Sequence, residues 1–209
     1  MSIGKKLLGK EQSKYAEDLI LVNRVIDGDM KAFEQIVKQY KPMMAKVIIG
    51  MVGNREDAED IGQESFIRFY RAVHHYKGDA ALGTYLTRIA INLSLNELKK
   101  RKSNNPVSLE EKHETQHSDS RSFQKRDNSE LVQQALVRLE TKYRSVVVLR
   151  LIQGFSTKET AKILKIPSGT VLSRLSRGQE RLRQIINDLE SLAPAEGQII
   201  EKTVPYISK

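Results

Sequence analysis

The residues best suited to binding chemistry in this sequence are hydroxyls and arginines that recur at helical spacing between Ser168 and Arg181. Arginine can bind guanine edges or phosphates through parallel hydrogen bonds, and short hydroxyls can donate to a phosphate at a helix N-terminus. The pattern therefore predicts a helix that contacts duplex DNA. The candidate contact residues are Ser168, Thr170, Ser173, Arg174, Arg177 and Arg181.

The residues before this helix have the features of a helix-turn-helix, with the DNA-contacting helix second. Ser156 and Glu159 have the spacing of a capping box at the start of a short first helix, and Pro167 is expected to end it. An ordinary helical hairpin with a solvated arginine face is the alternative, and the coincidence of cap and proline break favours DNA binding. Gly178 fits less well, because glycine inside a helix costs about 1 kcal/mol relative to alanine.

A second face of nucleic-acid type lies on a helix expected from about Thr84 to Lys102. An aromatic ring can stack on an unstacked base, amides can read base edges and a basic run can hold phosphates, which suits melted or single-stranded DNA. The alternative is a partly buried tyrosine beside lysines that complement the helix dipole. The candidate residues are Tyr85, Arg88, Asn92, Asn96, Lys99, Lys100 and Arg101.

A third helix, expected from Asp57 to Val73, carries acidic residues on its outward face. Acids in a first turn suit the helix dipole, whereas an acidic face on a basic protein can also dock a basic partner. The pattern leaves these two interpretations open. The expected inner stripe is Ala58, Ile61, Ser65, Phe66, Phe69, Tyr70 and Val73, and the outward residues include Asp57, Asp60, Gln63 and Glu64.

The composition of the 209 residues narrows the class of protein. A net charge of +9 suggests a polyanionic partner, and 39% hydrophobic residues with 6% aromatics and no tryptophan favour helical packing. The absence of cysteine excludes a disulfide framework, a thiol nucleophile and a Cys-ligated metal. No glycine-rich phosphate loop or nucleophile–base pair is present, so neither an enzyme nor a cofactor is expected. No metal site is expected at His74-His75, because neighbouring helical side chains diverge, or at His113 and His117, which lie in a polar stretch.

Changes in composition divide the chain into five parts. Residues 1–17 are predicted to be a loose basic leader, residues 18–102 a helical domain, and residues 103–129 a polar, flexible linker. Residues 130–192 are predicted to form the helix-turn-helix domain and residues 193–209 a tail. The sequence has no apolar run long enough for a signal peptide or membrane span, so we expect a soluble, cytoplasmic protein without membrane insertion.

This order of parts resembles the bacterial RNA polymerase sigma factors of the extracytoplasmic-function type, group 4 of the sigma-70 family. The segment DAEDIGQESFIRFYRAV resembles the core-polymerase-binding helix of that family, and YKGDAALGTYLTRIAINLSLNELKKRK resembles its −10 element segment. The segment LRLIQGFSTKETAKILKIPSGTVLSRLSRGQERLR resembles its −35-reading segment. The resemblance covers most of Asp18 to Leu192.

The resemblance implies an all-α fold of two small domains, a sigma region 2 bundle and a region 4 helix-turn-helix, joined by the linker. It implies core RNA polymerase, promoter DNA and an anti-sigma factor as partners, with no enzymatic activity. Asp57, Asp60, Ile61, Gln63 and Glu64 would bind core polymerase. The loop from Tyr76 to Leu82, including Tyr76 and Lys77, would shape a pocket for a flipped base before the −10-reading helix.

The sequence departs from the family pattern at three places. Tyr85 stands where tryptophan is common, Asn96 where aspartate is frequent, and Gly178-Gln179 where Ala-Arg is more usual. Two other classes compete with the family assignment. A free-standing helix-turn-helix regulator would bind duplex DNA tightly without polymerase. An RNA-binding protein is compatible with the charge, but the duplex-reading second domain counts against it.

Overall fold

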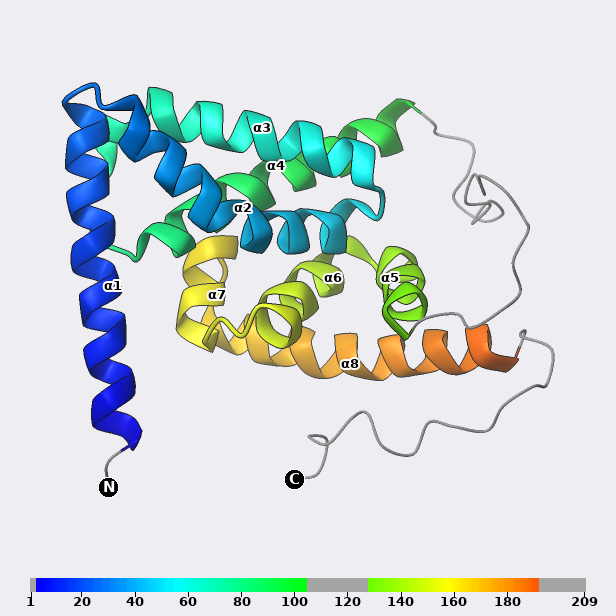
Figure 1. The fold of residues 1–209 in the computed structure, drawn as a ribbon. Helices are drawn as coiled ribbons and strands as arrows, with labels where there is room; N and C mark the ends of the chain where they lie inside the picture. The colour runs from blue at the N-terminus through cyan, green and yellow to red at the C-terminus, as the bar shows by residue number, and fades with distance from the viewer. Residues whose placement is uncertain (1–2, 105–127, 192–209) are drawn as a thin grey trace.

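The computed structural model describes residues 3–104 and 128–191, and every regular element within these two ranges is helical (Figure 1). The predicted linker and tail fall almost wholly outside the described residues. The elements are α1 (Ile3–Ile26), α2 (Met30–Val52), α3 (Arg55–Arg71), η1 (Val73–His75), α4 (Leu82–Asn104), α5 (Asn128–Arg138), α6 (Thr141–Val147), η2 (Val148–Ile152), α7 (Thr157–Leu164) and α8 (Ser168–Ser191).

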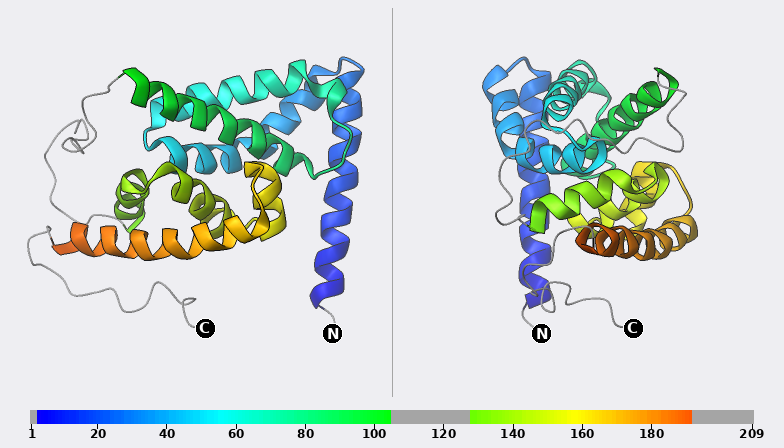
Figure 2. Two further views of the ribbon diagram at one scale, coloured as in Figure 1. Left: turned by 180° about the vertical axis from the view of Figure 1, so that it is seen from behind. Right: turned by 90° about the vertical axis from the view of Figure 1, so that its right-hand side faces the viewer.

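The helices form two layers that correspond to the two predicted domains (Figures 1 and 2). Helices α2, α3 and α4 make one layer, α5 to α8 make the other, and α1 runs across the end of the first. Helix α2 is central, because it contacts α1, α3 and α4 in its own layer and α5, α6 and η2 in the other. The predicted all-α, two-domain fold is confirmed, but the domains pack together on one continuous hydrophobic core.

The buried face of α2 explains its central place. Apolar residues recur every three or four positions along it, from Ala32 and Ile36 to Met51 and Val52, and all are fully or almost fully buried. The Asp29 side chain accepts hydrogen bonds from the first-turn amides, and Gly53 ends the helix in the left-handed conformation.

The prediction of a loose leader over residues 1–17 is wrong from Ile3 onward, where α1 begins. The chain is helical from Ile3, so no boundary lies near residue 17. The second half of α1 is docked on α2: the buried carboxylate of Asp18 accepts hydrogen bonds from the hydroxyl of Tyr40 and from Nε2 of Gln39, 3.1 Å away. A docked segment removes the cost of nucleation, and a lysine-, leucine- and glutamate-rich sequence then continues the helix. The sequence pattern did not predict this helical start, because the prediction depended on a recurring apolar face, which begins only near Asp18.

The predicted inner stripe of α3 is confirmed with one exception. Ala58, Ile61, Ser65, Phe66 and Phe69 are buried, as is Val73 in η1. Tyr70 is instead 39% exposed, with its ring 5.0 Å from that of Phe33 on α2. A tyrosine at the edge of an apolar stripe can pack one ring face and leave its hydroxyl in water.

The predicted helix-turn-helix is confirmed in its local details. The hydroxyl of Ser156 accepts from the Glu159 amide at 3.2 Å, and the Glu159 carboxylate accepts from the Ser156 amide at 2.8 Å. Helix α7 ends at Leu164, since Lys165 has a φ of 54° and turns the chain before Pro167. Helix α8 then starts at Ser168 and continues to Ser191.

The contact between the two layers includes a buried arginine. Arg144 of α6 is only 6% exposed, and one guanidinium nitrogen donates to the Met51 carbonyl of α2 at 2.6 Å. The rest of the group donates to the carbonyls of Leu139, at 2.9 and 3.2 Å, and of Val137. Burial lowers the pKa of Arg144 to about 10, so the group remains charged near neutral pH. One side chain thus binds the carboxyl-terminal ends of α5 and α2.

Gly178 has a packing role that the sequence did not reveal. It is buried in α8 where α6 crosses, and a Cβ there would lie 3.0 Å from Cγ2 of Val147 and 3.3 Å from Cβ of Tyr143. The glycine therefore allows α6 and α8 to approach closely. Its conformational cost in the helix is offset by this packing.

We expect Gly178→Ala to lower the melting temperature, whereas Gly169→Ala in the same helix should raise it. The added methyl group at Gly169 meets no atom within 4 Å, so only the helix-propensity gain of up to about 1 kcal/mol remains. At Gly178 that gain competes with overpacking, which typically costs about 1–3 kcal/mol. Thermal unfolding of the two variants provides the check, and equal shifts would contradict the packing role.

Candidate nucleic-acid and polymerase interfaces

One face of α4 is open and polar along most of the helix. Arg88, Asn92, Asn96 and Lys99 are exposed at spacings of three or four residues, whereas Leu86, Ala90 and Ile91 on other faces are completely buried. Tyr85 is half-buried at the start of this face, and the guanidinium of Arg88 lies 5.1 Å from its ring. The burial of the other side fixes the helix, so the exposed face is presented in a defined orientation.

The loop before α4 is organised by Tyr76 from within. Tyr76 is 8% exposed, its ring lies 5.1 Å from the ring of Tyr85, and its hydroxyl donates to the Ala80 carbonyl at 2.7 Å. Burial raises the pKa of Tyr76 to about 12, so the hydroxyl keeps its proton. Lys77 is exposed on the outer side of the loop. Of the two predicted loop contacts, Lys77 is therefore accessible and Tyr76 supports the loop.

Two predicted site residues from different interfaces bind each other. The Arg101 guanidinium forms an ion pair with Asp57, and a second with Glu97 at 3.3 Å. It also donates to the Val52 carbonyl at 3.4 Å. Arg101 therefore ties the end of α4 to the start of α3 and to the end of α2. The guanidinium group predicted to contact DNA is therefore occupied by contacts within the protein.

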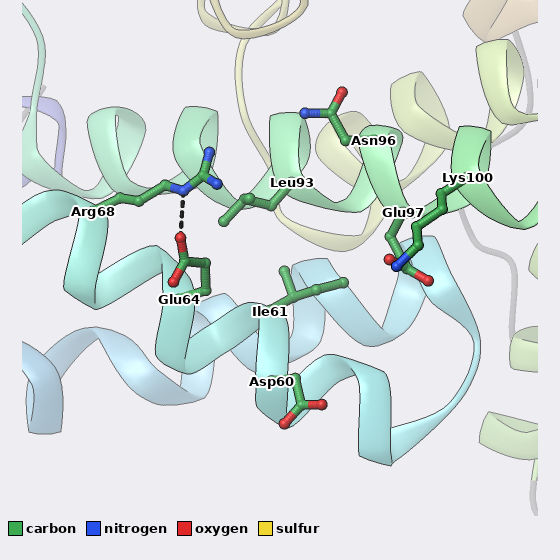
Figure 3. Close-up of a pocket in the computed structure, with 8 residues that line it drawn as sticks. All are labelled: Asp60, Ile61, Glu64, Arg68, Leu93, Asn96, Glu97 and Lys100. Carbon is green, nitrogen blue, oxygen red and sulfur yellow. Dashed lines mark hydrogen bonds and ion pairs between the residues drawn. The ribbon is translucent and has the colours of Figure 1, made fainter.

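A groove of about 300 Å³ lies between α3 and α4 (Figure 3). Ile61 and Leu93 point toward each other across its floor, and Glu64 pairs with Arg68 at 2.7 Å on one side. Asp60 and Gln63 are exposed, whereas Ile61 is 8% exposed. The predicted polymerase-binding residues thus form an acidic helix face beside an apolar strip. The lining residues are Asp60, Ile61, Glu64, Arg68, Leu93, Asn96, Glu97 and Lys100.

The predicted DNA-binding face of α8 lies mostly on the surface. Ser168, Ser173 and Arg177 are exposed, and Thr170 and Arg174 are half-buried. Val171 and Gly178, both buried, fix the opposite side of the helix. The face carries hydroxyls in its first turn and arginines one and two turns later, as expected for a helix that enters a major groove.

Arg181 is placed differently from the other residues of this face. Its guanidinium forms an ion pair with Glu140 and lies 4.7 Å from the ring of Tyr143. Lys142 also pairs with Glu140, at 2.8 Å. Arg181 therefore packs α8 against the start of α6, and a phosphate contact would have to compete with Glu140.

Both halves of the chain match models of known protein families. Residues 36–104 match the model of Sigma-70 region 2, and residues 129–182 match that of Sigma-70, region 4. The ECF RNA polymerase sigma factor SigW of Bacillus subtilis (strain 168) is 35% identical over 179 residues, 80% of this chain and 96% of the relative. This chain belongs to the ECF sigma factors. It is an alternative sigma factor, which binds core RNA polymerase and directs it to promoters.

Two further relatives support the same family. The RNA polymerase sigma-H factor of Pseudomonas aeruginosa (strain PAO1) is 32% identical over 184 residues, 83% of this chain and 95% of the relative. The ECF RNA polymerase sigma-E factor of Escherichia coli (strain K12) is 33% identical over 188 residues, 85% of this chain and 98% of the relative.

Solved structures show the same fold. CnrH, solved in complex with the cytosolic domain of CnrY, has a TM-score of 0.60 and 21% identity, and the match covers 82% of this chain and 97% of that one. RpoE of Bartonella quintana, solved with the anti-sigma factor NepR, has a TM-score of 0.61 and 22% identity, with 75% and 98% covered. In the sigma factor described here, no helix within residues 3–104 and 128–191 is long and apolar enough to cross a membrane.

Proposed function

We propose that this ECF sigma factor divides its work among three helices. Helix α3 docks on the largest polymerase subunit through Asp60, Gln63 and Glu64, with Ile61 packing behind them. The exposed face of α4, with the loop before it, receives and reads the opened −10 element. Helix α8 reads the −35 element as duplex, through Ser168, Thr170, Ser173, Arg174 and Arg177.

The observation that carries this proposal is the combination of two polar reading faces of different type. The α4 face offers a half-buried tyrosine ring, two exposed amides and, at its end, lysines. Stacking on an aromatic ring contributes about 1–3 kcal/mol per base, which can offset an unstacking cost of a few kcal/mol. The α8 face offers arginines and hydroxyls but no aromatic side chain, which suits an intact major groove.

The residues engaged within the protein take supporting roles in this proposal. Tyr76 shapes the loop from inside, and Arg101 holds Asp57 at the start of α3. Lys99 and Lys100 are exposed and remain available for phosphates near the −10 element. Arg181 supports α8 through Glu140 and Tyr143.

The experiment that tests the whole proposal is multi-round transcription in vitro with purified core polymerase on a genomic promoter library, with and without this protein. We expect new transcripts that start a fixed distance from shared −35 and −10 motifs. Duplex binding without any effect of core polymerase would instead indicate a free-standing regulator. The chemistry of RNA synthesis belongs to the polymerase in this proposal, and the sigma factor contributes no catalytic group.

The docking face predicts a specific charge effect. Asp60→Lys should weaken binding to core polymerase by at least about 10-fold, because it places a cation where an acidic face meets a basic partner. Glu59→Lys is the matched control, since Glu59 is an exposed acid on the neighbouring position of α3 that points to a different side. Titration of labelled variants with core polymerase measures both, and equal losses would argue against a local docking face.

An anti-sigma factor is the third proposed partner, acting on this protein in the cytoplasm. The support is that RpoE was solved with the anti-sigma factor NepR and CnrH with the cytosolic domain of CnrY, and both share this fold. Pull-down with the tagged protein from the native host, followed by a transcription assay with each recovered protein, tests this part.

A further inference from the structure

The loop from Tyr76 to Leu82 is contacted by α1, which lies far from it in the sequence. The hydroxyl of Tyr15 in α1 donates to the Gly78 carbonyl at 2.6 Å, across 63 positions of sequence. Gly78 has a φ of 77°, and a Cβ at this position would lie 2.9 Å from the Tyr15 hydroxyl oxygen and 3.3 Å from Cδ2 of Leu19. The surface of α1 therefore lies directly against the loop backbone.

Helix α1 is a firm support for this contact. One turn after Tyr15, the buried Asp18 carboxylate binds Tyr40 and Gln39 of α2. Burial, followed by the hydrogen bond to Asp18, raises the pKa of Tyr40. The Lys14 ammonium group lies 5.1 Å from the Tyr40 ring. These contacts fix the register of α1 on α2, and with it the position of the Tyr15 hydroxyl.

The same loop is joined to the reading face of α4 by aromatic packing. The Tyr76 ring lies edge-on to the Tyr85 ring at 5.1 Å, and Tyr85 lies 6.2 Å from the ring of Phe69 in the core. The loop thus has three fixed points: the Tyr15 bond at Gly78, the Tyr76 bond at Ala80 and the ring contact at Tyr85. The first of these comes from α1, which neither matched family segment includes.

We propose that Tyr15 is a positioning residue for −10 recognition, which holds the 76–82 loop in the shape that receives an unstacked base. This inference rests on the proposed function of the loop and of α4. Helix α1 then takes part in promoter selectivity without touching DNA through Tyr15. Loss of the hydroxyl loosens the loop and lets wrong bases be accepted, while core binding and −35 reading stay the same.

The test uses the full-length protein, core polymerase and a promoter recovered from the library experiment, with single-base variants of its −10 and −35 elements. Tyr15→Phe removes only the hydroxyl. Because one hydrogen bond contributes about 0.5–1.5 kcal/mol, −10 discrimination should fall roughly 2- to 10-fold. Discrimination at −35 should not change. Tyr70→Phe is the matched control, since Tyr70 is 39% exposed, Tyr15 is 38% exposed, and the ring of Tyr70 packs on Phe33 of α2.

A double-mutant cycle adds a readout that general destabilisation would not produce. Gly78→Ala places a methyl group against the Tyr15 hydroxyl and should itself reduce −10 discrimination. In the Tyr15→Phe background the contacted oxygen is absent, so the additional loss should be smaller than in the parent. Strictly additive losses would overturn the direct contact as the cause.

Asn92→Ala separates this inference from the proposed function. Asn92 is exposed on α4, so the variant probes base reading with little effect on the fold. If Asn92→Ala loses −10 discrimination while Tyr15→Phe behaves like Tyr70→Phe, the role of Tyr15 is wrong and the −10 assignment stands. If both variants keep full discrimination, the −10 assignment fails and the role of Tyr15 fails with it. Loss in Tyr15→Phe but not in Tyr70→Phe supports the inference.

Discussion

Replacing Arg174 and Arg177 with alanine together is expected to lower transcription from −35-dependent promoters by on the order of 100-fold or more. An arginine that binds a base edge contributes about 1–3 kcal/mol of discrimination, and both side chains lie on the reading face of α8. An arginine that binds a phosphate instead contributes about one unit to the salt slope of binding. The single variants therefore distinguish the two roles. Loss of an arginine that binds a base edge relaxes the sequence preference, and loss of one that binds a phosphate flattens the salt dependence of binding.

The control for this prediction is Arg183→Ala. Arg183 is an exposed arginine of the same helix and pairs with Glu180 at 3.1 Å, away from the proposed reading face. The measurement is holoenzyme binding and transcription on a promoter with an intact or a scrambled −35 element, at several salt concentrations. If Arg183→Ala is as damaging as either reading-face variant, net charge rather than α8 geometry governs recognition.

Replacing Arg144 with alanine is expected to destabilise the protein by about 3–5 kcal/mol, because the change leaves buried carbonyls without a donor and opens a cavity beside them. The carbonyls of Met51, Val137 and Leu139 would all lose their guanidinium donor inside the protein. An unsatisfied buried carbonyl costs about 1–3 kcal/mol, and the removed side chain leaves a cavity as well. Denaturant unfolding of the full chain measures the loss.

Arg144→Lys is an informative companion variant. A lysine keeps the charge but cannot reach two helix ends with a planar, forked group, so most of the loss should remain. Arg138→Ala provides the control, since Arg138 is an exposed arginine at the end of α5. Recovery of full stability by lysine would show that charge alone, rather than the three carbonyl contacts, holds the interface.

The local features of this protein were predictable from sequence because they depend on neighbouring residues. The capping box of Ser156 and Glu159 and the apolar spacing of α3 were both read correctly, apart from the exposed Tyr70. The reading faces of α4 and α8 also follow from helical spacing. Their roles in recognition stay predictions, although the structure exposes most of their residues.

The features that were missed join residues far apart in the sequence. Tyr15 meets Gly78, Arg101 meets Asp57, and Arg144 meets Met51. No periodicity or spacing rule connects such pairs, because they depend on how helices dock. The same reason applies to Gly178, whose unfavourable place inside a helix is explained only by the packing of α6 against it. The one sequence signal for such a contact was a glycine in the middle of an expected helix, which can mark a place where another helix packs closely.

The Arg144 contact also affects how tightly the protein binds any partner that separates its two layers. Any complex that moves the two layers apart must first break the bond to Met51 and expose the apolar surface between α2 and the second layer. The apparent dissociation constant of such a complex equals the intrinsic constant divided by the fraction of molecules already open. Each 1.4 kcal/mol by which the closed form is favoured therefore weakens apparent binding about tenfold. Variants at this contact should therefore alter the affinity for every partner that binds only the open form.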